Sequence, residues 1–315
     1  VTFTGFTVQN SGLTANDAGV FLLNVNGCNV ALNTVTNNAN GIAGAYGSGN
    51  SVSGNNVNLN AYYGIAFAGS SGNTIDLNIL AGNGLDAIAL DNASAIGGDI
   101  NIGSNGNYIK TNEIQSSNRD GIFIGENCGN NEITDGNSLD NIASVAIHIW
   151  RPGNEVITDN IINSGLTGIR LLGSSDNIIT GNTITGTGIG FKIDASWQVG
   201  VWYPSSNNTI ENNIIAGNTT YGMDASGNNG TNVDVSHNWW GSNTGPANLT
   251  NNPCGTGDAV SDNVKYDPWW NSATMEFEVY QIQEFEVTGT TSICVGGTTN
   301  ITLSGSQDGS PDYAY

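Results

Sequence analysis

Basic residues are scarce in this sequence. Six Lys and Arg stand against 27 Asp and Glu in 315 residues, which gives a formal net charge of −21. A surface this acidic repels phosphate, and binding to nucleic acid through counterion release requires Lys and Arg. The composition therefore excludes nucleic acid as a partner.

Long apolar runs and good helix formers are also missing. The apolar runs are only a few residues long, so no segment of the sequence is expected to span a membrane. Asn and Gly, both poor helix formers, contribute 49 and 44 residues. Pro is limited to 6 residues and 38% of the chain is hydrophobic, which argues against disorder. These features favour an all-β protein.

A short pattern repeats along the chain. A Gly or Ala followed by an apolar residue recurs nine times, 22 to 34 residues apart, and the apolar residues are Val20, Ile42, Ile65, Ile88, Ile122, Ile147, Ile169, Phe191 and Met223. In most units a second pattern follows, Asn-x-Ile/Val with another Asn five residues after the first, as at Asn73 and Asn78. A regular period of this length predicts a stacked repeat architecture.

The composition of one unit predicts its structure. Each apolar site lies in a period-2 segment of three to five residues, which is typical of a short strand. Asn and Gly between these segments tolerate the left-handed backbone of a tight corner. We therefore expect coils of three short strands, stacked about 4.8 Å apart, with corner Asn side chains hydrogen-bonded from coil to coil. The nine apolar residues should form one buried column.

This pattern resembles the right-handed parallel β-helix repeat of the pectate-lyase-like superfamily, over residues 1 to about 240. The resemblance implies a right-handed parallel β-helix of at least nine coils. The rhythm ends at a Trp-rich segment, 237–270, which resembles the closing motif of β-helices in large bacterial surface and adhesin-like proteins. We expect this segment to cap the open end of the solenoid, so that the β-helix with its cap occupies residues 1–270.

Two further segments follow the expected cap. Residues 271–287 alternate as a connecting strand segment, and residues 288–315 resemble the start of an Ig-like β-sandwich module. Residues 288–315 are too few for such a module, so we expect the chain to be part of a larger multidomain protein. Cys28 and Cys128 lie four coils apart, too far to form a disulfide, and Cys294 is left to pair with a Cys beyond Tyr315.

Aligning the coils predicts which residues share the outer face of the strand that carries the apolar column. The residues after the apolar sites include Phe123, His148, Arg170 and Lys192 on successive coils, and those two positions further on include Trp150 and Asp194. We expect His148, Arg170 and Lys192 to form a narrow positive stripe. Trp150 lies beside this stripe, and the 194–207 insert with Trp197 and Trp202 forms a wall. Such a stripe would favour acidic glycans.

Acidic residues precede this stripe. Asp86, Asp91 and Asp120 are expected on the two coils before it and form a tentative calcium site. The superfamily resemblance implies a role for such a site, because its lyases commonly pair carboxylate-bound calcium with an Arg or Lys base. On that reading His148, Arg170 and Lys192 are the candidate catalytic residues. The competing reading is a strip of ordinary surface ion pairs.

The sequence leaves three functions open. The favoured one is a secreted or cell-surface, adhesin-like rod that presents a contact surface for glycans and requires no cofactor. The predicted ligand-binding residues on that surface are Phe123, His148, Trp150, Arg170, Lys192, Asp194, Trp197 and Trp202. The alternative is a calcium-assisted polysaccharide lyase. The third is a self-assembling filament or sheath subunit.

Overall fold

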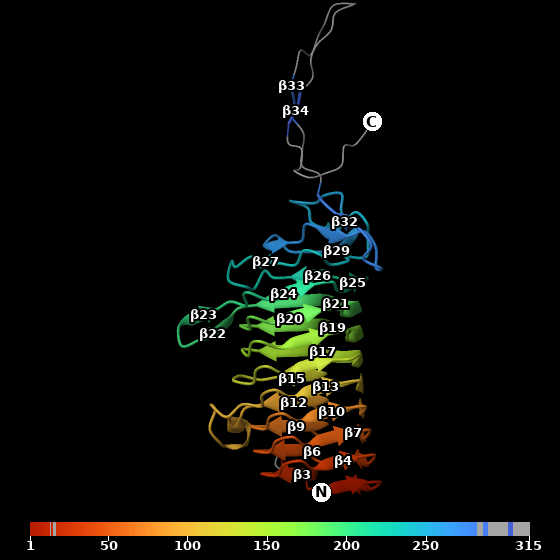
Figure 1. The fold of residues 1–315 in the computed structure, drawn as a ribbon, viewed down its shortest axis with the longest axis vertical. Helices are drawn as coiled ribbons and strands as arrows, with labels where there is room; N and C mark the ends of the chain where they lie inside the picture. Colours follow the sequence, from red (N-terminus) through yellow and green to blue (C-terminus); the bar gives the residue numbers. More distant parts are fainter. Residues whose placement is uncertain (13, 15–16, 282–285, 289–301, 305–315) are drawn as a thin grey trace, which may run out of the picture. The chain divides into compact units, whose positions relative to one another are not determined.

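The computed structural model describes residues 1–12, 14, 17–281, 286–288 and 302–304. The chain divides into two compact units, Val1–Val279 and Tyr280–Tyr315. The first unit is a stack of coils with three faces, and each coil contributes one strand to each face (Figure 1). Nine stacked strands on the first face correspond to about eight full turns of a parallel β-helix.

Face 1 is a parallel sheet of short strands. Every strand has three residues, because an Asn or Gly corner follows within two or three positions. The strands are β1 (Thr2–Thr4), β4 (Asn29–Ala31), β7 (Ser51–Ser53), β10 (Thr74–Asp76), β13 (Tyr108–Lys110), β16 (Glu132–Thr134), β18 (Val156–Thr158), β20 (Ile178–Thr180) and β24 (Thr209–Glu211).

Faces 2 and 3 belong to one larger sheet, because three long strands run across the corner between them. These strands are β17 (Ser138–Trp150), β19 (Ile161–Leu172) and β21 (Thr183–Asp194). The other strands of face 2 are β2 (Thr7–Gln9), β5 (Thr34–Thr36), β8 (Asn56–Asn58), β11 (Ile79–Ala81), β14 (Glu113–Gln115) and β25 (Ile214–Ala216). Those of face 3 are β3 (Ala18–Leu23), β6 (Asn40–Ala45), β9 (Ile65–Ala68), β12 (Ile88–Asp91), β15 (Ile122–Ile124) and β26 (Tyr221–Asp224).

The predicted apolar column is confirmed on face 3. Each of its nine residues is the register partner of the next, from Val20 and Ile42 to Phe191 and Met223. Eight of the nine are fully buried. Val20 is only partly buried, because β3 has a stacked neighbour on one side alone among the described strands.

Buried Asn side chains connect the coils at the corner between faces 1 and 2. Each Nδ2 donates to the Oδ1 of the next coil at 2.9–3.0 Å, so that the amides form one continuous ladder. The ladder consists of Asn33, Asn55, Asn78, Asn112, Asn137, Asn160, Asn182, Asn213 and Asn238. These amides also bond backbone groups of neighbouring coils, which satisfies corner groups that water does not reach.

A second ladder runs along the corner between faces 3 and 1, and it contains one acid. Asn50, Asn73, Asn107 and Asn131 lead to Glu155, after which Asn177 and Asn208 continue. Glu155 Oε2 accepts from the Asn131 backbone N–H at 2.8 Å, while Glu155 Oε1 and Asn131 Nδ2 have no hydrogen-bond partner in the described structure. Burial raises the pKa of Glu155 to about 8, outweighing the opposing contacts of Asn131.

Two inserts leave the stack between face 3 and face 1 (Figure 1). The first follows β12 and contains a 3₁₀ turn, η1 (Ala93–Ile96), with Asn92 as its N-cap. The second is an antiparallel hairpin of β22 (Ser196–Gln198) and β23 (Val201–Tyr203). Both inserts therefore border the face that carries the predicted cation column.

The Trp-rich segment packs on the last coil. The strand pairs in this segment and at its two ends are β27 (Val233–Asp234) with β30 (Val264–Lys265), β28 (Pro246–Ala247) with β29 (Gly257–Ala259), and β31 (Trp269–Trp270) with β32 (Glu278–Val279). Trp240 and Trp269 are buried in the same core as the coils. Trp270 Nε1 donates to Asn212 Oδ1, next to Asn213 of the first ladder. This packing covers apolar side chains at the end of the solenoid.

The described part of the second unit is small. It contains one antiparallel pair, β33 (Glu286–Thr288) with β34 (Thr302–Ser304). This pair does not show the predicted Ig-like sandwich. Cys294, which was expected to find a partner beyond the chain, lies outside the described residues, as does 282–285 of the expected connecting strand. Cys28, Cys128 and Cys254 are free, as expected for the first two.

Replacing a central ladder residue should destabilise the protein. Asn160→Ala removes the bonds to Asn182 Oδ1 and to the Ile133 carbonyl and leaves buried groups unpaired. We expect the free energy of unfolding to fall by at least about 1–3 kcal/mol, measured by urea denaturation. Asn232→Ala, at an exposed position outside both ladders, is the control and should change little. Equal effects of the two substitutions would contradict a stabilising ladder.

Glu155 should make stability depend on pH. The pKa of about 8 in the folded state lies above the ordinary 4.5, so the folded protein keeps a proton that the unfolded chain loses. Stability should therefore fall as pH rises from about 4.5 to about 8. Glu155→Gln should remove this dependence and stabilise the protein on the order of 1–4 kcal/mol at the upper end of the window. Parallel denaturation profiles for the two proteins across this range would contradict the assignment.

Candidate functional site

The outer surface of face 3 carries the predicted column of chemically active side chains. His148, Arg170 and Lys192 are register partners on β17, β19 and β21, with Phe123 before them and Asp224 after them. The sequence alignment of coils therefore placed these residues correctly. Neighbouring strands are close enough for the side chains to interact directly.

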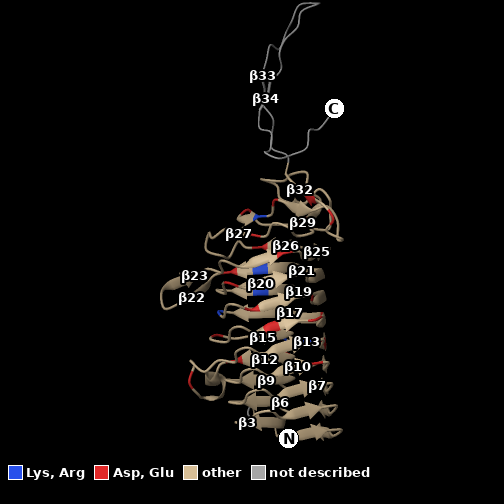
Figure 2. Cartoon of the chain, viewed as in Figure 1, with Lys and Arg blue, Asp and Glu red and all other residues tan. Residues whose placement is uncertain are grey.

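The cations of this column are paired with carboxylates. Arg170 donates to Asp194 at 2.8–3.0 Å, and Lys192 lies 3.6 Å from Asp194 and 2.7 Å from Asp224. Blue positions on β19 and β21 therefore have red positions close by in Figure 2. Burial favours a raised pKa for Asp224, but Lys192 and Ser226 lower it below the usual value. The column is therefore a strip of ion pairs, which is the competing reading of the sequence, because like charges one coil apart repel unless acids separate them.

The three Asp residues of the predicted calcium site also have separate partners. Asp86 is fully buried and paired bidentately with Arg119, Asp120 bonds His148, and Asp91 accepts from the Asn92 backbone N–H. Burial raises the pKa of Asp86 and of Asp91. The described residues contain no group of three or more His, Cys, Asp or Glu that could hold a metal ion. The structure does not bring these carboxylates into one cluster.

His148 is held by Asp120. Its Nδ1 lies 2.9 Å from Asp120 Oδ2, and Asp120 Oδ1 accepts from the Val145 backbone N–H. Burial works to raise the pKa of Asp120, but the hydrogen bond and charge of His148 lower it overall. His148 Nε2 is buried and has no partner in the described structure. A base in this position would have to be uncovered before it could reach a substrate.

Aromatic side chains lie next to the ion pairs. The rings of Phe123 and Trp150 are 6.2 Å apart, and the Arg151 guanidinium lies 5.3 Å from the centre of the Trp150 ring. Arg151 also pairs with Glu126 at 3.1 Å and donates to the Trp197 carbonyl at 3.0 Å. Arg151 thereby connects the hairpin β22–β23 to the Trp150 ring.

The hairpin carries a second pair of rings. Trp197 and Trp202 are cross-strand partners with ring centres 5.1 Å apart, and both are about half exposed. Exposed tryptophans are uncommon in soluble domains and mark contact surfaces when they cluster. We call Trp150, Trp197 and Trp202 the aromatic wall, because Arg151 contacts both the Trp150 ring and the Trp197 carbonyl.

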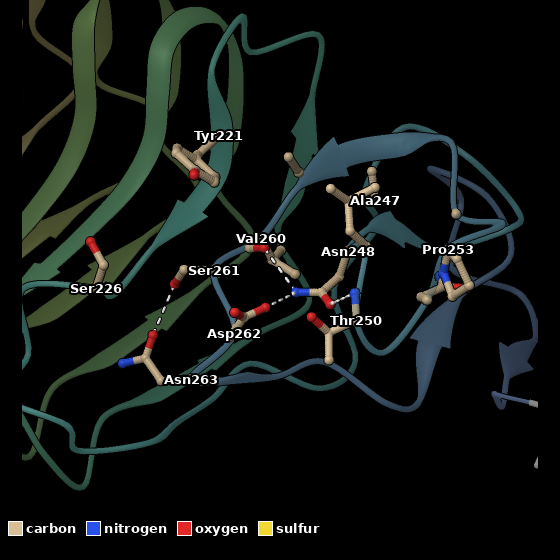
Figure 3. A pocket seen from close by; sticks show the side chains of 14 residues that line it. Tyr221, Ser226, Ala247, Asn248, Thr250, Pro253, Val260, Ser261, Asp262 and Asn263 are labelled. Carbon is tan, nitrogen blue, oxygen red and sulfur yellow. Dashed lines mark hydrogen bonds between the residues drawn. The ribbon is translucent and has the colours of Figure 1, made fainter.

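Two parts of this surface were not identified from the sequence. Arg119 is the partly exposed partner of the buried Asp86 and also lies 5.7 Å from the ring centres of Tyr63 and Phe123. A cleft of about 570 Å³ lies at the end of face 3, between Tyr221 and Ser226 on β26 and its following loop, and residues 247–263 of the cap (Figure 3). In the sequence, only the position of Arg119 directly before Asp120 pointed to a role for it. The cap has no repeat, so no sequence pattern predicted the cleft.

The chain belongs to the family described as right-handed beta helix region, whose model matches residues 98–263, just over half of the sequence. Residues 3–92 match a second model, described as periplasmic copper-binding protein (NosD). That stretch contains neither His nor Met and only one Cys, so it has a single side chain of the kinds that copper prefers. No curated protein matches the chain in sequence.

Solved structures share the fold. PfbA, a surface adhesin of Streptococcus pneumoniae, is 13% identical with a TM-score of 0.60, covering 95% of this chain and 84% of its own. The A-module of the mannuronan C-5 epimerase AlgE6 from Azotobacter vinelandii is 15% identical, with a TM-score of 0.58 and coverage of 77% and 65%. The Dettilon tailspike protein gp208 is 15% identical, with a TM-score of 0.51 and coverage of 80% and 48%.

These likenesses concern architecture. The chain spans slightly less than two thirds of the epimerase module and about half of the tailspike. The same β-helix therefore serves an adhesin, a tailspike and an epimerase. Within the described residues no helix is long and apolar enough to cross a membrane.

The ion pair between the buried Asp86 and the partly exposed Arg119 should contribute strongly to stability. Arg119→Ala leaves the Asp86 carboxylate buried without its partner, and we expect a loss of about 3–5 kcal/mol in unfolding free energy. Lys265→Ala breaks the exposed pair with Asp234 and should cost about 0–1 kcal/mol. Urea denaturation measures both. A double variant, Asp86→Ala with Arg119→Ala, should recover part of the loss, and no recovery would contradict the pairing as its cause.

Proposed function

We propose that this chain is a secreted, periplasmic or cell-surface β-helix protein whose face 3 binds a polysaccharide. The observation that carries the proposal is the wall of exposed Trp150, Trp197 and Trp202 beside fixed carboxylates. Aromatic rings stack on the apolar face of a sugar ring, and carboxylates accept hydrogen bonds from its hydroxyls. The match to a periplasmic family model and the surface-type neighbours are consistent with an exported protein.

The ligand we favour is a neutral glycan. Arg170 and Lys192 are already paired with Asp194 and Asp224, so they offer little unpaired positive charge to a uronate. The net charge of −21 repels polyanions at longer range. This departs from the acidic glycan that the cation column alone predicts.

A calcium-assisted lyase receives less support. Its three proposed metal ligands are bound to separate partners, and the Nε2 atom of His148 is buried. The simplest competing function is a structural rod without any ligand. On that view the ion pairs of face 3 are ordinary surface pairs, which contribute little to stability.

Removing the Trp150 ring should weaken glycan binding. A glycan array run at low salt identifies a neutral oligosaccharide of at least six units, and calorimetry then compares variants. Trp150→Ala should raise its Kd about tenfold, because lost ring stacking costs on the order of 1–2 kcal/mol. Tyr108→Ala, which removes an exposed ring from face 1, is the matched control.

Salt separates the two ligand classes. Binding of a neutral glycan should change little between 50 and roughly 500 mM salt, whereas binding through unpaired cations should weaken markedly. No binding to any neutral glycan, or binding to acidic glycans that Arg170→Ala with Lys192→Ala abolishes, would refute the proposal.

A further inference from the structure

The cleft in the cap has the chemistry of a sugar site. It is built from two parts of the chain that are distant in sequence: the end of face 3 with Tyr221 and Ser226, and the cap segments 247–255 and 259–263. Figure 3 shows Tyr221 and Ser226 on one side, Asn248, Thr250 and Pro253 on the other, and Val260 to Asn263 between them. Its volume of about 570 Å³ lies within the range of small-molecule sites.

The cleft is held open by hydrogen bonds within its own wall. Asn248 Nδ2 donates to the Val260 carbonyl at 3.1 Å and to Asp262 Oδ1 at 3.2 Å. Asn248 Oδ1 accepts from the backbone N–H groups of Thr250 and Asn251 at 3.0 and 2.8 Å. Asn252 Nδ2 donates to the Thr244 and Pro246 carbonyls, both at 2.9 Å. The loop therefore needs little ordering when a ligand binds, which lowers the entropic cost of binding.

The lining selects against charged ligands. Its side chains include one carboxylate, Asp262, and no Lys, Arg or His. An anion would meet Asp262 without a compensating cation, and a cation would find one carboxylate that already accepts from Asn248. The lining combines the apolar groups of Tyr221, Pro253 and Leu249 with the polar groups of Asp262 and Thr250. A ring with one apolar face and a rim of hydroxyls complements this arrangement.

The cleft is also continuous with the surface of face 3. Ser226 lines the cleft and donates to Asp224 Oδ1 at 2.6 Å, and Asp224 is the partner of Lys192 at 2.7 Å. A chain lying along face 3 would therefore reach the cleft at its last coil.

We propose that the cap cleft is a separate binding site for one or two neutral sugar units, with Tyr221 as the stacking platform and Asp262 as the hydroxyl acceptor. The inference rests on the proposed function for the class of ligand, and it assigns a site outside the aromatic wall of Trp150, Trp197 and Trp202.

Short and long ligands distinguish the two sites. The probes are a panel of disaccharides, namely cellobiose, maltose, lactose, xylobiose and mannobiose, titrated by saturation-transfer NMR against the whole chain. A disaccharide that fits the cleft should bind wild type and Trp150→Ala equally. Tyr221→Ala should raise its Kd at least about tenfold, and Tyr221→Phe, which keeps the ring, should stay within about threefold.

Further variants guard against misfolding. Asp262→Asn should raise the Kd of the same disaccharide about three- to tenfold, while Asp99→Asn, an exposed acid in the first insert, should leave it unchanged. Ala247→Trp fills the cleft without altering Tyr221 and should abolish disaccharide binding. It replaces Tyr221→Ala as the test if that variant does not fold. Unfolding midpoints equal to wild type verify each variant.

The outcomes separate the two proposals. Disaccharide binding lost in the cleft variants supports the site even if no long glycan binds face 3. Failure of all five disaccharides to bind, or binding that Trp150→Ala removes and Ala247→Trp does not, would overturn it. Long-glycan binding that depends on Trp150 alone would leave the proposed function intact while rejecting the cleft.

Discussion

The structure depends on how buried backbone turns are satisfied at the corners of each coil. Corner N–H and carbonyl groups lie away from water and must find partners inside the protein. An Asn amide offers both a donor and an acceptor, so one residue per coil can bond its own turn and the next amide. The ladder from Asn33 to Asn238 does this without a break. It fixes the stacking of coils, and therefore it also fixes which outward residues become neighbours.

That constraint explains what the sequence could predict. Once corners repeat in phase, residues at equivalent positions must become register partners, as Ile147 and Ile169 do in the core and His148 and Arg170 do outside. Both columns could be read from the apolar period, without knowledge of any side-chain contact. Val20 differs only because its strand has a stacked neighbour on one side among the described strands.

Contacts set by side-chain conformation could not be read in this way. The register places Arg170 beside Lys192, but it does not say that both turn toward Asp194. The same holds for Asp86, whose carboxylate accepts from the Arg119 side chain and the Asp120 backbone N–H on the next coil. The cap cleft was beyond prediction for a different reason, since residues 247–263 follow no period that would place them beside Tyr221.

The use of the few cations follows from these pairings. Four of the six Lys and Arg, namely Arg119, Arg151, Arg170 and Lys192, lie on or beside face 3. Each has a carboxylate partner that neutralises its charge, so these cations contribute little long-range attraction for an anionic ligand. The paired cations instead hold the carboxylates in one orientation. Arg151 also holds the hairpin β22–β23 through the Trp197 carbonyl. A surface of fixed acceptors and rings loses little conformational entropy when a ligand binds, which favours weak, hydroxyl-rich ligands that cannot offset a large ordering cost.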